Sequence, residues 1–128
     1  MVTARALTKV FGRGESAVTA LDAVDVHLAR GRFTAVMGPS GSGKSTLMHC
    51  LAGLESPTSG TITLDGVEIS SMSRRRLTRL RRENIGFVFQ AFNLVPSLSA
   101  EENIPLPLDI ARRRVDRDHF DRVIDAVG

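Results

Sequence analysis

Residues 38–46, with the sequence GPSGSGKST, constrain this chain more than any other stretch. They satisfy the pattern G-x-x-x-x-G-K-[ST] in full, and this pattern has a physical basis. Glycine lets the backbone turn where a Cβ would be forbidden, so that successive N–H groups point into one concavity that fits a polyphosphate. We call this stretch the phosphate loop, and we predict that it binds a nucleoside triphosphate.

Three groups in the phosphate loop have predicted roles. The Lys44 ammonium would lie over the β- and γ-phosphates, and the Ser45 hydroxyl would be a ligand of Mg²⁺. A helix starting near Gly43 would add the positive end of its dipole to the same anion site.

The sequence on both sides of the phosphate loop has the expected character. Residues 32–37 end in a short apolar run, which predicts a buried parallel strand. After the loop, Gly53 is placed to end a helix, whose apolar positions recur at helical spacing: Leu47, Met48, Cys50, Leu51 and Leu54. The alternative interpretation is a Gly/Ser turn with a solvated lysine. Such a turn would need neither an apolar strand before it nor a helix after it.

The composition is that of one soluble globular domain. The chain has 128 residues, of which 42% are apolar and 24% charged. No run approaches the ~18 apolar residues of a membrane span, and the N-terminus lacks the pattern of a signal peptide. Any link to a membrane is therefore expected through a partner. Cys50 cannot form an internal disulfide, and we interpret it as a buried core residue in a reducing cytoplasm.

Alternating apolar residues predict strands before the phosphate loop, within residues 1–37, and a hairpin at residues 61–69 with a type I′ turn at Asp65-Gly66. The next predicted helix, residues 74–83, has a narrow apolar stripe of Leu77 and Leu80 among six arginines. A solvated face explains these arginines, while an acidic partner or a nucleic acid remains an alternative. No aromatic residue interrupts the cluster to stack on bases, so we expect no nucleic acid.

Residues 85–89 form the most strand-like run in the chain, and Phe87 and Phe89 fall on one face, which predicts core packing. Gln90 ends this run. Ser99 is a plausible cap for a short helix that Pro105 and Pro107 interrupt. A final helix from about Asp116 places Phe120, Val123, Ile124 and Val127 on one stripe.

Residues 38–46, 56–66 and 85–90, the last followed by Phe92-Asn93-Leu94, together resemble the N-terminal half of an ATP-binding-cassette (ABC) transporter ATPase. The resemblance covers about residues 6–128 and is strongest to the branch that serves macrolide export and lipoprotein release. It implies an α/β fold: a P-loop NTPase (RecA-like) core with an N-terminal antiparallel β subdomain, and the start of a helical subdomain. The first part would be residues 1–93 and the second residues 94–128, with the cassette incomplete at its C-terminus.

The resemblance also implies roles for individual residues. Phe11 matches the aromatic residue that stacks on adenine, a position where tyrosine is common. Gln90 matches a glutamine that completes the Mg²⁺ shell or orients water, so that Lys44 and Gln90 are the catalytic candidates and Ser45 and Gln90 the metal ligands. The expected nucleotide-binding residues are Phe11, Gly38, Ser40, Gly41, Ser42, Gly43, Lys44, Ser45 and Thr46.

The family implies partners and an activity as well. We expect an ATP-binding ATPase subunit that pairs with a second ATPase subunit and contacts a transmembrane permease through the loop after Gln90. It would lie in the cytoplasm, peripheral to the inner face of the cell membrane. The 128 residues hold no signature loop, no Walker B strand and no switch histidine, so we expect ATP·Mg²⁺ binding with almost no hydrolysis. A binding-only half-cassette is the alternative; a small-molecule kinase or GTPase is a third possibility, without a counterpart for the segment around Gln90.

Overall fold

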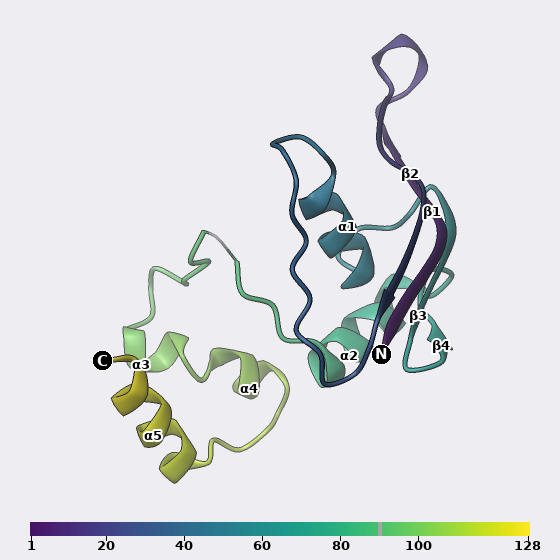
Figure 1. The fold of residues 1–128 in the computed structure, drawn as a ribbon. Coiled ribbons are helices and arrows are strands. Elements are labelled where there is room, and N and C mark those ends of the chain that lie inside the picture. The colour runs from purple at the N-terminus through teal and green to yellow at the C-terminus, as the bar shows by residue number, and fades with distance from the viewer. Residues whose placement is uncertain (90) are drawn as a thin grey trace. The chain divides into compact units, whose positions relative to one another are not determined.

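A computed structural model describes residues 1–89 and 91–128. The chain divides into two compact units, Met1–Arg81 and Arg82–Gly128, and each is described by itself. The first unit holds a sheet and the helix that follows the phosphate loop, and the second holds the last three helices of the chain (Figure 1). The subdomain boundary expected after residue 93 stays a prediction.

The sheet has four strands in the order β2-β1-β3-β4, and every neighbouring pair is antiparallel. The strands are β1 (Val2–Phe11), β2 (Val18–Leu28), β3 (Ser59–Leu64) and β4 (Val67–Glu68), with a 3₁₀ turn η1 (Gly14–Ser16) between the first two. The strands predicted from alternating residues up to Leu28 and in the hairpin are therefore confirmed. This sheet is the N-terminal antiparallel β part that the family resemblance implied.

The β3–β4 connection is the type I′ turn that the sequence predicted. Both central residues have positive φ angles, 48° at Asp65 and 82° at Gly66, and Leu64 pairs with Val67 across the turn. Such turns match the right-handed twist of the strands they join, which is why Asp-Gly is favoured there.

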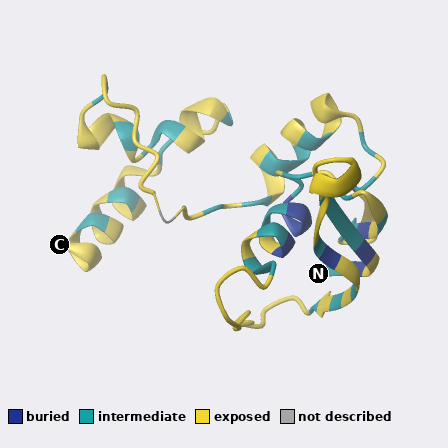
Figure 2. Ribbon diagram, turned by 90° about the horizontal axis from the view of Figure 1, so that it is seen from above, coloured by how far each residue is buried: buried dark blue, intermediate teal, exposed yellow. Residues whose placement is uncertain are grey.

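Helix α1 (Lys44–Leu51) packs one face against the sheet and forms the core with it (Figure 2). The buried residues of the helix are Leu47, Cys50 and Leu51, and the sheet contributes buried side chains such as Leu7 and Ile62. Burial raises the pKa of the Cys50 thiol, as expected for a cysteine inside a core. The core interpretation of Cys50 is thus confirmed.

Helix α2 (Arg74–Asn84) presents its narrow apolar stripe to that core. Leu77 and Leu80 are partly buried against the core cluster, whereas the helix has no fully buried residue. Arg81 donates a hydrogen bond to the carbonyl oxygen of Gly53, just after the end of α1. The arginine-rich face is accordingly a largely solvated surface in the structure.

Two predicted strands do not form. Residues 32–37 and 85–89 have no regular secondary structure, and Phe33, Met37 and Val88 are 97%, 87% and 96% exposed. A strand exists only when a neighbour completes its hydrogen bonds, and no described strand pairs with either stretch. Phe87 and Phe89 contact each other, with ring centroids 4.4 Å apart, but neither is buried, so the predicted core packing is wrong.

The second unit contains α3 (Ala100–Asn103), α4 (Leu106–Ile110) and α5 (Arg117–Val127). Ser99 caps α3 in a complete capping box with Glu102, and Asp116 caps α5 through the backbone N–H of His119. Helix α3 ends before Pro105, as expected, and the two prolines stand at the start of α4, where the missing N–H has no cost. None of the described helices is both long and apolar enough to cross a membrane.

Candidate functional site

The phosphate loop wraps around the start of α1 and lies directly against β2. Gly43 is the N-cap of the helix and has a φ angle of 84°, and its carbonyl oxygen accepts a 2.8 Å hydrogen bond from the N–H of Leu47. A Cβ at Gly43 would lie 2.3 Å from the carbonyl oxygen of Ala20 in β2. Only glycine fits this conformation and this close approach, so the sequence requirement of the pattern has a visible cause.

The loop encloses a hollow of ≈ 240 Å³. Its lining consists of one residue of β2 and seven consecutive residues of the loop: Ala20, Ser40, Gly41, Ser42, Gly43, Lys44, Ser45 and Thr46. The described residues that line it carry no carboxylate. The structure therefore brings together every residue predicted to form the phosphate cradle except Gly38, whose carbonyl contacts the Lys44 side chain instead.

The Lys44 ammonium lies inside the loop. Its Nζ donates to the carbonyl oxygens of Gly38 and Pro39, at 2.9 and 2.6 Å, and to the Ser42 hydroxyl at 3.3 Å. These three acceptors match the three donors of an ammonium group. The loop thus holds one positive charge beside the N-terminus of α1, where the helix dipole favours an anion.

Phe11 stands at the last position of β1, where it pairs with Val18 of β2. It is 42% exposed, and the Lys9 ammonium lies over its ring, 4.8 Å from the centroid. Two residues beyond Val18, Ala20 lines the phosphate hollow, so the same two-stranded ribbon carries Phe11 and one wall of the hollow. Gln90, the remaining predicted site residue, lies outside the described residues.

The hollow fits a polyphosphate with a bound metal ion. A fixed ammonium and the N-terminus of an eight-residue helix provide positive potential, and Ser45, the second residue of that helix, is exposed. Neutral oxygen ligands such as a serine hydroxyl suit Mg²⁺, which takes most of its ligands from water and phosphate. The chemistry of these residues therefore agrees with Mg²⁺-bound triphosphate as the ligand.

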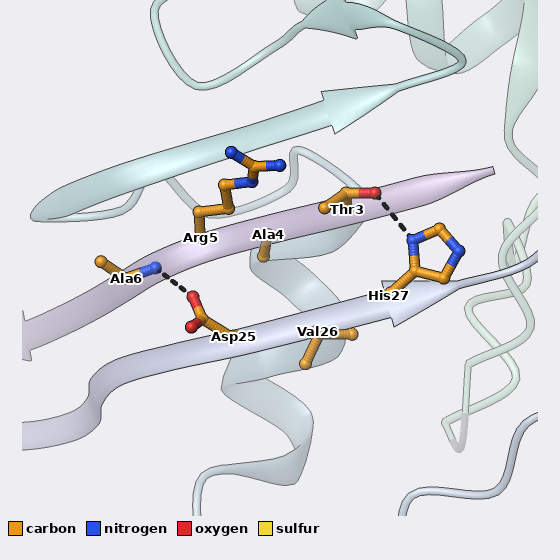
Figure 3. Close-up of a pocket in the computed structure, with 7 residues that line it drawn as sticks. All are labelled: Thr3, Ala4, Arg5, Ala6, Asp25, Val26 and His27. Atoms are coloured by element: carbon orange, nitrogen blue, oxygen red, sulfur yellow. Dashed lines mark hydrogen bonds between the residues drawn. The ribbon is translucent and has the colours of Figure 1, made fainter.

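A larger hollow, of ≈ 580 Å³, lies along β1 and β2 (Figure 3). Three of its polar side chains, those of Thr3, Asp25 and His27, already have partners within the ribbon. The Asp25 carboxylate accepts a 2.7 Å hydrogen bond from the backbone N–H of Ala6, and Thr3 Oγ1 is 3.1 Å from His27 Nδ1. This hollow is open and, although the Arg5 guanidinium lines it, all of its lining residues belong to two strands and none to a helix N-terminus, so the phosphate hollow is the better candidate.

Comparison with known protein families shows to which family the chain belongs. The profile of the family described as "ABC transporter" matches residues 21–128. The chain belongs to this family. The resemblance inferred from the phosphate loop and the segment around Gln90 is confirmed.

Individual relatives agree with the branch that the sequence indicated. The chain is 41% identical over 128 residues to a macrolide export ATP-binding/permease protein, MacB, of Bdellovibrio bacteriovorus, covering 100% of this chain and 20% of the relative. It is 42% identical over 124 residues to the lipoprotein-releasing system ATP-binding protein LolD of Bordetella pertussis, covering 95% of this chain and 54% of the relative. The chain thus spans from a fifth to about half of these relatives.

A solved structure has the same fold. The ABC transporter cassette MJ0796 superposes with a TM-score of 0.87 at 38% identity, over 98% of this chain and 55% of that chain. It was solved as a dimer, and a second structure, with the same scores, shows MJ0796 in a post-hydrolysis state bound to ADP and Pi. The α/β cassette fold predicted from the sequence is confirmed by this likeness.

Lys9 was not among the residues predicted from the sequence to belong to the site. Its ammonium reaches both the Phe11 ring and the segment after α1. A signal was present, because Lys9 and Lys44 are the only lysines among many arginines and Lys9 stands two positions before Phe11, on the same face of a strand. The distant partners of Lys9 could not be read from that spacing.

Proposed function

We propose that this chain is the ATP-binding part of an ABC transporter ATPase and that it binds ATP·Mg²⁺ at the phosphate loop. One observation carries the proposal: the loop and the start of α1 enclose a hollow with the Lys44 ammonium within the loop and no carboxylate in the described lining. The nucleotide-bound state of the related cassette MJ0796 supports the choice of ligand.

Each side chain has a proposed task in binding. Lys44 exchanges its loop acceptors for phosphate oxygens, and Ser45 holds Mg²⁺ through its hydroxyl. The backbone N–H groups of residues 40–46 bind the phosphate oxygens, and the Phe11 ring stacks on adenine. For Gln90 the proposal rests on the family resemblance alone: its amide oxygen would join the Mg²⁺ shell or orient water. Bound Mg²⁺ supplies charge neutralisation of the phosphates.

We also propose that the chain works with a separate transmembrane permease and a second ATPase subunit, on the cytoplasmic face of the membrane. The names of the macrolide export and lipoprotein-releasing relatives support the first partner, and the dimeric form of MJ0796 supports the second. The loop that follows Gln90 is the proposed contact with the permease.

The 128 residues by themselves are proposed to bind ATP with turnover near background. They contain no match to the signature loop, the Walker B strand or the switch histidine, and none of the described residues that line the phosphate hollow is a general base. A binding-only half-cassette is the alternative function. A signature loop and a Walker B strand in the same reading frame would decide for the transporter ATPase.

The test measures ATP·Mg²⁺ binding and turnover by the 128-residue chain and by Lys44→Ala, with calorimetry and a phosphate-release assay. Each lost charge-assisted bond costs about 1.5–3 kcal/mol, so affinity should fall roughly tenfold or more. Arg117→Ala in α5 is the matched control, since it removes one positive charge far along the chain from the loop. Equal affinity of Lys44→Ala and wild type would overturn the site, and rapid Lys44-dependent turnover would overturn the account of incomplete catalysis.

A further inference from the structure

Lys9 has an environment that is unusual for a lysine in a small domain. Only 12% of its side chain is exposed, although lysine is normally among the most exposed residues. Its Nζ donates to Glu55 Oε1 at 2.6 Å and to the carbonyl oxygen of Ser56 at 2.8 Å, and it lies 4.8 Å from the centroid of the Phe11 ring. The ammonium therefore joins three groups from two separate segments.

Backbone contacts next to Lys9 bind the same two segments together. The N–H of Val10 donates to Thr58 Oγ1 at 2.9 Å, and the N–H of Thr58 donates to the carbonyl oxygen of Thr8 at 2.8 Å. The end of β1 is thus fixed to the segment of residues 55–58 that leaves α1. Because α1 begins in the phosphate loop, Lys9 links the strand that carries Phe11 to the helix that carries the phosphate site.

Packing covers the Phe11 ring only in part. Phe11 stands at the end of its strand, 42% exposed, and the loop that follows begins at Gly12. Phenylalanine also lacks the hydroxyl group with which a tyrosine could hydrogen-bond. A cation within about 6 Å of a ring centroid is attracted to the ring face, so the fixed Lys9 ammonium restrains the ring.

We propose that Lys9 is a positioning residue for the adenine base: it holds the Phe11 ring in place so that ATP meets a preordered stacking surface. The inference rests on the proposed function, because it requires ATP to bind with its base on Phe11. Restraining the ring before binding reduces the entropy that binding would otherwise cost. The effect should appear in the affinity for the base and leave the affinity for the phosphates unchanged.

The experiment compares two ligands, ATP·Mg²⁺ and inorganic tripolyphosphate with Mg²⁺, on the 128-residue chain and its variants. Lys9→Met keeps the aliphatic stem and removes the charge, and we expect about two- to fivefold weaker ATP binding with unchanged tripolyphosphate binding. Lys9→Arg retains a cation and should restore the ATP affinity. In a Phe11→Leu background, Lys9→Met should cause no further loss.

A second variant covers the case in which Lys9→Met fails to fold. Glu55→Gln weakens the anchor of the ammonium while keeping a hydrogen-bond acceptor, and it should give a smaller loss that is again selective for ATP. Thermal unfolding of each variant reports on the structural role of Lys9 separately.

Each outcome supports or overturns the inference. Equal losses for ATP and tripolyphosphate, or no loss for either, would show that Lys9 only stabilises the fold. Additive losses in the Phe11→Leu background would show that it acts through another group. The Lys44→Ala measurement tests the proposed function itself. If ATP binding does not depend on Lys44, both the proposed function and the inference fail. If ATP binding depends on Lys44 but Lys9→Met has no ATP-selective effect, only the inference is overturned.

Discussion

The absence of a side chain at Gly43 allows the phosphate loop to lie against β2. The residue caps α1 with a φ angle of 84°, and its α-carbon faces the carbonyl oxygen of Ala20. Any side chain here would destabilise the fold in two ways. One is the strain of the left-handed backbone conformation, and the other is the steric clash with the carbonyl oxygen of Ala20. Gly41 has a φ angle of 78° with open space around the position of a Cβ, so a side chain there would cause only the backbone strain.

This pair of glycines allows the two effects to be separated. We expect Gly41→Ala to lower the free energy of unfolding by about 1–2 kcal/mol from backbone strain. Gly43→Ala should lose that amount and roughly 1–3 kcal/mol more, because Ala20 must move away from the new methyl group. Urea unfolding without nucleotide measures both. Equal destabilisation by the two variants would show that the contact with Ala20 has no energetic consequence.

At the scale of elements, the sequence correctly predicted the features that depend only on residues close together in the chain. The spacing of the phosphate loop, the Asp65-Gly66 turn and the cap at Ser99 depend on backbone conformation within a few residues, and the structure has all three. Residues 32–37 have the apolar run of a buried strand but no pairing partner among the described strands. Strand formation is decided by distant neighbours, so the sequence pattern alone was misleading there.

The residues of the candidate site differ in the same way: some could be predicted from local sequence, and others could not. The residues of the phosphate cradle are nearly consecutive, and their spacing was enough to predict which of them line one hollow. Phe11 was expected only through the family resemblance. Lys9 was not expected at all, since its partners Glu55 and Ser56 lie far along the chain. Tertiary contacts of this kind leave no local pattern.

Asp65, in the turn between β3 and β4, also forms ion pairs with one group beside β1 and one beside β2. The Asp65 carboxylate accepts from Arg30 at 2.7 Å, just after β2, and from the Met1 ammonium at 2.6 Å, just before β1. The hydrogen bond from Arg30, followed by that from the N-terminus, lowers the pKa of Asp65 from 3.8 to about 2. The carboxylate therefore favours the folded state as long as it is ionised.

This lowered pKa predicts acid sensitivity in a defined window. The stabilisation by Asp65 is fully present above pH 3.8 and is lost as the pH falls through about 2. Asp65→Asn keeps a residue suited to a type I′ turn and removes the charge. We expect its urea midpoint to lie below that of wild type at neutral pH, with the difference shrinking as the pH falls through the window. Arg30→Gln should show the same trend, and a difference that stays constant with pH would contradict the prediction.

At the scale of the whole molecule, each unit exposes an apolar segment that has the sequence of a buried strand. Phe33 and Met37 are exposed in the first unit, and Val88 is exposed in the second. The chain spans 55% of the related cassette chain MJ0796. Segments that expose apolar side chains in a strand-like sequence readily associate with another chain.

We therefore predict that the 128-residue chain self-associates, with a sedimentation coefficient that rises with protein concentration. Val88→Lys places a charge in one of the exposed segments and should shift the chain toward monomer, because an unpaired charge opposes burial in a strand contact. Val127→Lys is the matched control, because it makes the same substitution at a valine that is 76% exposed. This valine is the last residue of α5, where a cation interacts favourably with the helix dipole. If association proceeds through residues 85–89, only the first variant weakens it. A monomer at every concentration, with a sharp and concentration-independent thermal transition, would mean that these segments are stable without a partner.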